Sequence, residues 1–331
     1  MNRLLLPLLL CSFLTQAQNI LRVNNNVGVN APYTTIASAI AAAGVNDIII
    51  VEGSVTAYDN ITITKKVNII GPGYFLLENL NFQGSTNSAS LSTISLGAGS
   101  DGSSFFGLNI TGNISIADNV PSSNLTVSNC RIGALTLSGT VNNFYISGCY
   151  ITNNLVFTNL SQFTGAIVSN NYISGFGQGS LTTLVNLTHN IIAGSISSSY
   201  NCDFLNNILI GQNNTSRYYN SIIKNNVFTV TQATLDGAGS PIDGTNFFSA
   251  LTTDLFVGLA NNTTDTQWKL KAGSPAIGAG ISGVDCGMYG GNNPYRPSGI
   301  QLGQPTINSI TVPASVQQNG TLNVKVSAKV N

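Results

Sequence analysis

Short apolar segments recur along the middle of the chain, and each copy has the same order of residue types. An apolar residue is followed by a polar residue, a small or Asn-rich pair and an apolar end. Six copies are VSNCRI at 127, ISGCYI at 146, VSNNYI at 168, LTHNII at 187, FLNNIL at 204 and IKNNVF at 223. Their fourth positions are separated by 19, 22, 19, 17 and 19 residues, which indicates a repeat protein.

A repeat of this length suits one coil of three short strands joined by turns. The repeats have no helical periodicity, and the Leu-rich consensus of leucine-rich repeats is absent. The sequence therefore predicts an all-β fold, a right-handed parallel β-helix, in which successive coils stack at ~4.8 Å. From Asp47 to Phe228 the chain has room for about nine or ten coils.

The fourth position of each copy predicts a ladder of equivalent side chains along the axis. It holds Cys130, Cys149, Asn171, Asn190, Asn207 and Asn226, and Leu108 takes this place in a weaker earlier copy. Asn suits the position because it tolerates left-handed backbone in a turn and because stacked amides hydrogen bond along a ladder. We expect the two Cys residues to be unlinked, since the ladder spacing exceeds the usual disulfide Cβ separation of ~3.8 Å.

One clear helix signal lies near the N-terminus. Residues 33–44 read YTTIASAIAAAG, with Thr34 or Thr35 as the cap and Gly44 as the stop. One face of this helix carries Ile36, Ala39, Ile40 and Ala43. We expect the helix, near 34–43, to cap the first coil, because an open coil exposes unpaired strand edges. The first strands follow, in DIIIVEGSV from Asp47 and ITIT from Ile61.

Residues 1–17 have the pattern of a secretory signal peptide, with Arg3, an apolar run and a small residue at Ala17. The run is too short for a resident membrane helix, and no other stretch approaches the ~20 apolar residues that a span requires. We therefore expect a protein that is secreted or lies on the outer cell surface. Lipidation at Cys11 is less favoured, because a large residue precedes it.

The β-helix with its capping helix is expected to occupy residues 18–300, and residues 301–331 form a short C-terminal β extension. The segments INSITVPASV and GTLNVKVSAKVN alternate apolar and polar residues, as strands do. Two strands do not make an independent domain. The extension either packs back along the solenoid or begins a sandwich unit.

Charge is scarce in this chain. Lys plus Arg and Asp plus Glu each total 12, and only 7% of residues are charged. The largest basic cluster is the pair Lys65 and Lys66, which excludes a nucleic-acid binder, because such a protein needs clustered cations against phosphates. The hydrophobic content of 43% excludes a disordered chain.

Both ends of the predicted solenoid resemble a known family. These segments are TTIASAIAAAGVNDIIIVEGSVTAYDNITITKKVNIIGPG from Thr34, WKLKAGSPAIGAG from Trp268 and GVDCGMYGGNNPYRPSGI from Gly283. They resemble secreted bacterial right-handed β-helix repeat proteins of the pectate-lyase-like superfamily, over most of the mature chain. The resemblance implies the fold, but that family includes lyases, hydrolases, epimerases, adhesins and members without assigned activity. Fold alone does not choose among these functions, and we expect the non-catalytic or uncharacterised branch.

Catalysis on this scaffold needs charged groups that the repeat body lacks. Hydrolysis uses two or three carboxylates on one face, and a lyase uses an Arg or Lys base with carboxylates that hold Ca²⁺ against a uronate. Between Asp118 and Asp203 there is no acidic residue, and Arg131 is the one formal charge. We therefore expect no catalytic site there, no metal site and no cofactor. The alternative function is that of a polysaccharide lyase or glycoside hydrolase. We expect bound Ca²⁺ only if the protein is such a lyase.

The remaining catalytic candidates lie near the last coils. Asp236 and Asp243 are in the segment LDGAGSPIDG, and Arg217 and Lys224 lie on nearby coils. We favour the interpretation of the two Asp residues as turn residues. His189, the one histidine, stands where sister repeats have Asn, so we expect a ladder residue rather than a general base.

Binding is the better supported class of function. A regular surface rich in Asn, Ser and Thr, with aromatic residues at intervals, offers hydrogen bonds and stacking faces to a glycan or another extracellular polymer. Tyr218 and Tyr219 are candidate ligand-binding residues, and one of them should be exposed because neighbours on a strand point to opposite faces. Further candidate aromatics are Tyr145, Tyr150, Tyr172, Phe176 and Tyr200. Ice binding is less favoured, because the Thr-x-Thr pattern of ITIT does not recur in register.

Overall fold

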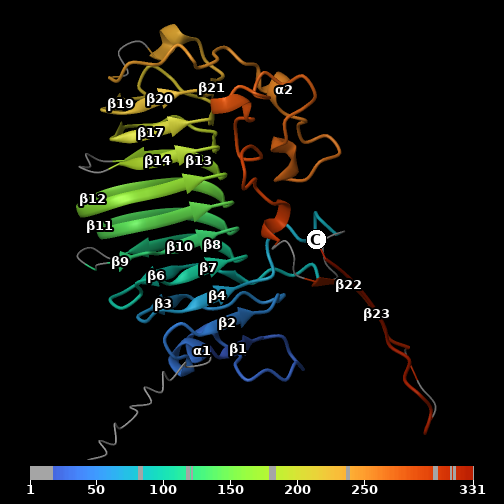
Figure 1. Cartoon of the computed structure of the whole chain (residues 1–331). Coiled ribbons are helices and arrows are strands. Elements are labelled where there is room, and N and C mark those ends of the chain that lie inside the picture. Colours follow the sequence, from blue (N-terminus) through green and yellow to red (C-terminus); the bar gives the residue numbers. More distant parts are fainter. Residues whose placement is uncertain are drawn as a thin grey trace, which may run out of the picture.

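The computed structural model describes residues 18–80, 85–116, 120, 122–178, 184–235, 239–300, 305–313, 315 and 318–330. The predicted signal peptide at 1–17, with Cys11, lies outside the described residues. The described chain forms an all-parallel β-solenoid of about eight turns, with strands stacked one above another along its length (Figure 1).

Three columns of strands run along the solenoid, and four longer strands turn corners between them. The first face contains β1 (Ile20–Val23), β2 (Ile48–Val51), β4 (Asn68–Ile70), β7 (Ser104–Phe106), β10 (Thr126–Ser128), β14 (Val185–Thr188), β17 (Cys202–Leu205) and β20 (Ile222–Lys224). The second face contains β5 (Ser90–Leu91), β15 (Ile191–Ile192), β18 (Ile208–Leu209) and β21 (Val227–Phe228). The third face contains β3 (Ile61–Ile63) and β6 (Ile94–Leu96). Three short strands, β9 (Ser122–Ser123), β16 (Ser199–Tyr200) and β19 (Tyr218–Tyr219), lie between the third face and the next strand of the first face. The corner-turning strands are β8 (Asn109–Ile116), β11 (Arg131–Ser147), β12 (Tyr150–Ser169) and β13 (Tyr172–Gln178).

The core of the solenoid is a stack of apolar side chains that point inward from every coil. On the first face the paired inward residues are Ile49, Ile69, Phe105, Val127, Ile146, Val168, Leu187, Phe204 and Ile223, all buried. Residues on either side of each one point outward, because side chains alternate along a strand. This alternation is the reason why short apolar segments recur in the sequence.

The coils are unequal in length, which explains why there are fewer than the nine or ten expected. Ile69 of β4 pairs with Phe105 of β7, 36 residues later in the sequence. The chain leaves the solenoid after Gly71 and returns at Ser90, so this one turn uses nearly two repeat lengths. The strand β1, which precedes the helix, was not expected and pairs with β2.

The helix α1 spans Ile36–Ala42, close to the predicted 34–43. Thr35 is its N-cap, because the Thr35 hydroxyl accepts from the Ser38 amide at 3.2 Å. The predicted apolar face is buried in the core. The helix lies beside β1 at the N-terminal end of the solenoid (Figure 1). Its capping role stays a prediction.

An inner column of side chains runs along the corner between the first and second faces. Its buried members are Leu108, Cys130, Cys149, Asn171, Asn190, Asn207, Asn226 and Asn246. Each Asn accepts from the amide of the equivalent residue one coil earlier, as in the 2.8 Å bond from Asn190 N to Asn207 Oδ1. Its Nδ2 donates to a first-face carbonyl, such as Leu187 O at 2.8 Å from Asn207. Cys130 and Cys149 are free thiols at the N-terminal end of this column.

The left-handed backbone that we expected at these Asn residues lies one position earlier. The outer column consists of Asn129, Gly148, Asn170, His189, Asn206 and Asn225, with φ between 50° and 64°. The chain turns the corner at these residues, and the following Asn then directs its amide into the core. Asn and Gly are favoured here because other side chains are strained at positive φ.

Residues 248–300 form a segment that we call the C-terminal wrap. Side chains of the outer column hydrogen bond to it. The wrap contains α2 (Thr252–Leu255) and the 3₁₀ turns η2 (Thr266–Trp268), η3 (Ile281–Gly283) and η4 (Pro297–Gly299), and a further 3₁₀ turn, η1 (Gln232–Leu235), precedes it. It runs back beside the solenoid (Figure 1) and buries the outward side chains Ile191, Ile208 and Val227 of the second face. Asn170 Nδ2 donates to Gly290 O at 2.8 Å, and Asn206 Oδ1 accepts from Ile281 N at 2.8 Å.

His189 is the titratable member of the outer column. Its ring lies against Gly290 and Gly291 of the wrap, where a Cβ on Gly291 would be only 2.9 Å from Nε2. Asn206 Nδ2 lies 3.4 Å from the same nitrogen. Burial lowers the pKa of His189 below its ordinary value of 6.5. The packed wrap therefore favours the neutral ring.

We expect stability to fall when the pH drops below about 6.5. The unfolded state takes up the proton at its ordinary pKa, whereas the folded state resists protonation until the pH passes its lower pKa, so the unfolded state is favoured across that interval. Melting temperatures at pH 7.5 and pH 5 measure the effect. The variant His189→Asn, which places the residue of sister coils at this position, should lose this part of the pH dependence. An unchanged difference in that variant would assign the effect to other groups.

The C-terminal extension is an antiparallel pair of strands, β22 (Pro305–Thr311) and β23 (Lys325–Val330). Residues 301–304, which precede it, lie outside the described residues. Within the described chain, none of the helices is both long and apolar enough to cross a membrane.

Candidate functional site

Of the four catalytic candidates, the structure describes Arg217, Lys224 and Asp243, and the hydrogen bonds of Asp243 and Arg217 stay within their own turns. Asp243 accepts from Thr245 N at 2.7 Å, and hydrogen bonds from the Thr245 side chain and amide lower the pKa of Asp243. Lys224 lowers that pKa further by its charge. Arg217 donates to the carbonyls of Asn214 and Ser216 in its own turn. Asp236 lies outside the described residues.

The other acidic residues near the last coils are also separate. Asp203 stands on β17, where burial raises its pKa, and Asp254 forms an exposed ion pair with Lys271 at 3.1 Å. In the part of the chain that the structure describes, no three or more His, Cys, Asp or Glu side chains are grouped to hold a metal ion. The described residues therefore provide no grouped carboxylates of the kind that the lyase or hydrolase alternative needs.

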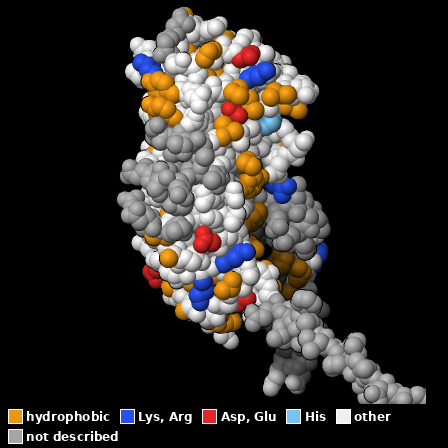
Figure 2. Space-filling model, turned by 60° about the vertical axis from the view of Figure 1, so that its left-hand side comes forward, with side chains coloured by type: hydrophobic (Ala, Val, Ile, Leu, Met, Phe, Trp, Pro, Cys, Tyr) orange, Lys and Arg blue, Asp and Glu red, His pale blue; other side chains and the backbone are white. Residues whose placement is uncertain are grey.

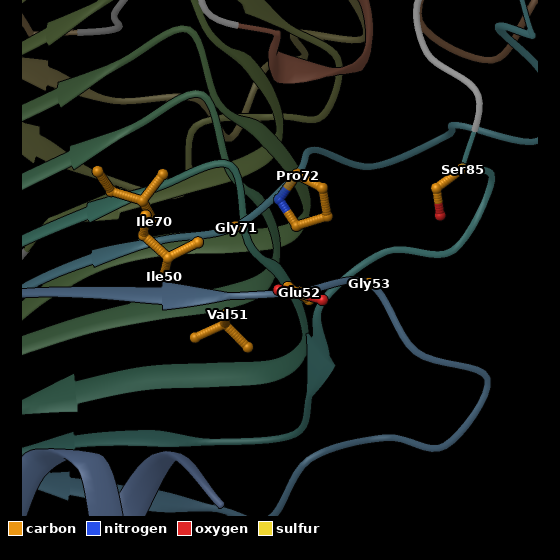
Figure 3. Close-up of a pocket in the computed structure, with 8 residues that line it drawn as sticks. All are labelled: Ile50, Val51, Glu52, Gly53, Ile70, Gly71, Pro72 and Ser85. Carbon is orange, nitrogen blue, oxygen red and sulfur yellow. The ribbon is translucent and has the colours of Figure 1, made fainter. Parts of the chain in front are cut away.

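A hollow of about 290 Å³ lies where the chain leaves the solenoid after β4. Ile50 and Ile70 extend into it from one side of β2 and β4, whereas Val51 points the opposite way, toward the core (Figure 3). Its one charged lining group, Glu52, is occupied by an ion pair with Arg22. The walls are thus mainly apolar, and the hollow offers few polar partners to a hydrated ligand.

Amide and aromatic groups gather instead at the corner between the third and first faces. We call this surface the corner strip. Its corner residues, at positive φ, are Asn124, Asn143, Gly165, Asn201 and Asn220. Beside them on the first face stand the paired outward residues Thr126, Tyr145, Ile167, Asn186, Asp203 and Ile222. On the third-face side, Tyr200 and Tyr219 are paired on adjacent coils.

The middle of the corner strip contains a hollow of about 360 Å³. It is lined by Asn143, Tyr145, Ile167 and Asn186, together with the backbone near Gly165. Ile167 is 47% exposed. A Cβ added to Gly165 would meet nothing within 4 Å, so the hollow is open on the side of Gly165. An apolar floor with amides at its edge suits a sugar ring, which has apolar faces and an equatorial rim of hydroxyl groups.

The C-terminal end of the corner strip carries a stacked aromatic pair. The rings of Tyr200 and Tyr219 are 4.6 Å apart with an interplanar angle of 22°. Tyr219 is 36% exposed, whereas Tyr218 is fully buried. Tyr218 was predicted as a ligand-binding candidate together with Tyr219, and this is corrected: its ring points into the core, and its hydroxyl lies 3.2 Å from Gln212 Oε1.

The third face carries a shorter column of hydroxyl groups. Thr62, Ser95, Ser115 and Thr136 stand in register on successive coils. The sequence did not indicate this alignment, because unequal coil lengths conceal it. The column is interrupted at Val156, the next partner, so it does not form an extended hydroxyl array.

Sequence reasoning identified the aromatic members of the corner strip but missed most of the others. Tyr145, Tyr200 and Tyr219 were predicted candidates, whereas Asn143 and Asn186 were not. The available signal was a position directly before a buried apolar residue, because neighbouring residues on a strand point to opposite faces. Comparisons with protein-family models, curated proteins and solved structures find no match to this chain. The resemblance to the pectate-lyase-like superfamily therefore stays a prediction.

Proposed function

We propose that this protein binds a glycan of the extracellular space through the corner strip, without turning it over. The observation that carries this proposal is the juxtaposition of Tyr145 and Ile167 with the amides of Asn143 and Asn186 around one open hollow. Aromatic and aliphatic groups stack on sugar rings, while amides both donate and accept hydrogen bonds with hydroxyl groups.

The surface around the site is consistent with a neutral partner. Among the described residues of the face in Figure 2, uncharged polar side chains and backbone are common, and charged side chains are few. Such a surface provides hydrogen bonds without the long-range attraction that selects charged polymers. The proposed location, outside the cell or on its outer surface, rests on the pattern of residues 1–17.

Glycan-array binding followed by calorimetry on the positive glycans tests the proposal. We expect Tyr145→Ala to weaken binding by about 2- to 12-fold, because it removes an aromatic contact of about 0.5–1.5 kcal/mol. Tyr145→Phe should keep most of the affinity, since the ring remains. Tyr74→Phe is a matched control, because Tyr74 is buried far from the strip beside Tyr295.

The same samples separate binding from turnover. Incubation with the bound polysaccharide should release no new reducing ends and no unsaturated products. Product formation would contradict the non-catalytic proposal, and loss of binding in the Tyr74 control alone would place the site elsewhere.

A further inference from the structure

We propose that the corner strip binds a neutral, linear polysaccharide whose chain runs parallel to the solenoid axis, across successive coils. This inference rests on the proposed function and adds the orientation, the charge and the minimum length of the ligand. Three features of the strip support it: the repetition of like groups along the axis, the separation of two aromatic contacts and the distribution of charge.

Like groups recur on the corner strip in the direction of the axis. Asn143 Nδ2 donates to Asn124 Oδ1 at 3.1 Å, one coil apart, and Asn220 donates to Asn201 in the same way further along. These exposed pairs orient amides identically on successive coils. A polymer aligned with the axis presents one similar unit to each coil, since coils are separated by ~4.8 Å and one sugar unit has about that length.

Aromatic contacts lie at two separated points of the strip. Tyr145 stands beside the central hollow, and Tyr219 stands at the C-terminal end, on the coil that contains Ile222. The register Tyr145, Ile167, Asn186, Asp203, Ile222 places four coil steps between them. Four steps correspond to about 19 Å, so an extended chain needs about five sugar units to contact both rings.

The charge of the strip argues against an acidic polymer. Its one charged residue is Asp203, on the coil between the two aromatic points. None of the strip residues defined above is Lys or Arg, so a uronate chain would bring carboxylates beside Asp203 without gaining an ion pair. Ca²⁺ bridging is not provided either, because the strip supplies a single carboxylate, whereas Ca²⁺ takes six to eight oxygen ligands.

The length of the ligand provides the test. Calorimetric titration with neutral β-linked gluco-, xylo- and manno-oligosaccharides of two to eight units should give an affinity that rises until about five units and then levels off. For the longest oligomer, Tyr145→Ala and Tyr219→Ala should each reduce affinity by about 2- to 12-fold. For a disaccharide, at most one of the two variants should have an effect. Tyr145→Phe and Tyr219→Phe should restore affinity in both cases, which separates ring contacts from misfolding.

Other outcomes would contradict either the orientation or the charge that we assign to the ligand. Equal affinity for disaccharide and octasaccharide would overturn the axial orientation while leaving glycan binding in place. Tighter binding of polygalacturonate or alginate, or of the cationic polymer chitosan, would overturn the assignment of a neutral ligand. If none of these neutral, acidic or cationic glycans binds, both the inference and the proposed function fail.

Discussion

Replacement of Asn207 by Ala is expected to reduce the free energy of unfolding by about 3–5 kcal/mol. Asn207 is fully buried in the middle of the inner column. Its Oδ1 accepts from the amide and from the Nδ2 of Asn190, and its Nδ2 donates to Leu187 O and to Asn226 Oδ1. Removal of the side chain leaves several of these buried groups without a partner, and each unsatisfied group costs about 1–3 kcal/mol.

Chemical denaturation measures this effect, with far-UV circular dichroism as the probe of the solenoid. The control is Asn143→Gly, an exposed Asn at φ 52°, because Gly165 already occupies the same position one coil later. It should cost less than about 1 kcal/mol. Equal losses in the two variants would contradict the inner column as a source of stability.

Replacement of Asp265 by Ala is expected to detach the C-terminal wrap and to cost about 3 kcal/mol. Asp265 is fully buried. Its carboxylate accepts from Ser298 N at 2.7 Å, from Thr263 Oγ1 at 2.6 Å and from the Tyr295 hydroxyl at 3.3 Å. Asn79, from the segment between β4 and β5, donates to the same carboxylate at 3.4 Å. One side chain thus joins the wrap to a segment nearly 190 residues earlier.

The single tryptophan makes this prediction specific. Trp268 lies in the wrap and contacts Tyr172 of the solenoid, with ring centroids 4.9 Å apart. In Asp265→Ala the Trp268 fluorescence should change at lower denaturant than the circular dichroism, whereas in Asn207→Ala the two should change together. The control is Asp254→Ala, which removes only the exposed ion pair with Lys271 and should cost at most about 1 kcal/mol. Coincident transitions in Asp265→Ala would contradict a separate role for the wrap.

The repetitive parts of this protein were predictable because they depend on short-range patterns. The 19-residue period, the helix at Ile36–Ala42 and the exposure of one residue of the Tyr218–Tyr219 pair all follow from local periodicity. The position of Asn171 and its equivalents in a ladder follows from the same period. The number of turns did not follow, because the long segment between β4 and β5 has no repeat signal.

The corner strip was only partly predictable for a related reason. Asn143, Tyr145 and Asn186 come together because β11, β12 and β14 stack in one particular register, and coils of 19 and 22 residues alternate around them. The aromatic residues can be read from the sequence, but which of them lie at the same corner of the solenoid depends on the register of the stacked coils. The hollow beside Gly165 is formed by residues of three stacked strands, so no single segment of the sequence identifies it.

By itself, the sequence determined an all-β solenoid of about 19-residue coils, its N-terminal helix and its uncharged body, since these properties are set by the alternation of apolar and polar residues within each coil. The tertiary structure alone decided which outward residues are covered and which are exposed. The wrap buries the second face because residues distant in sequence, such as Asp265 and Asn79, meet there. The described wrap leaves the corner strip uncovered because it lies at the other edge of the first face, where the outer column supplies its hydrogen bonds.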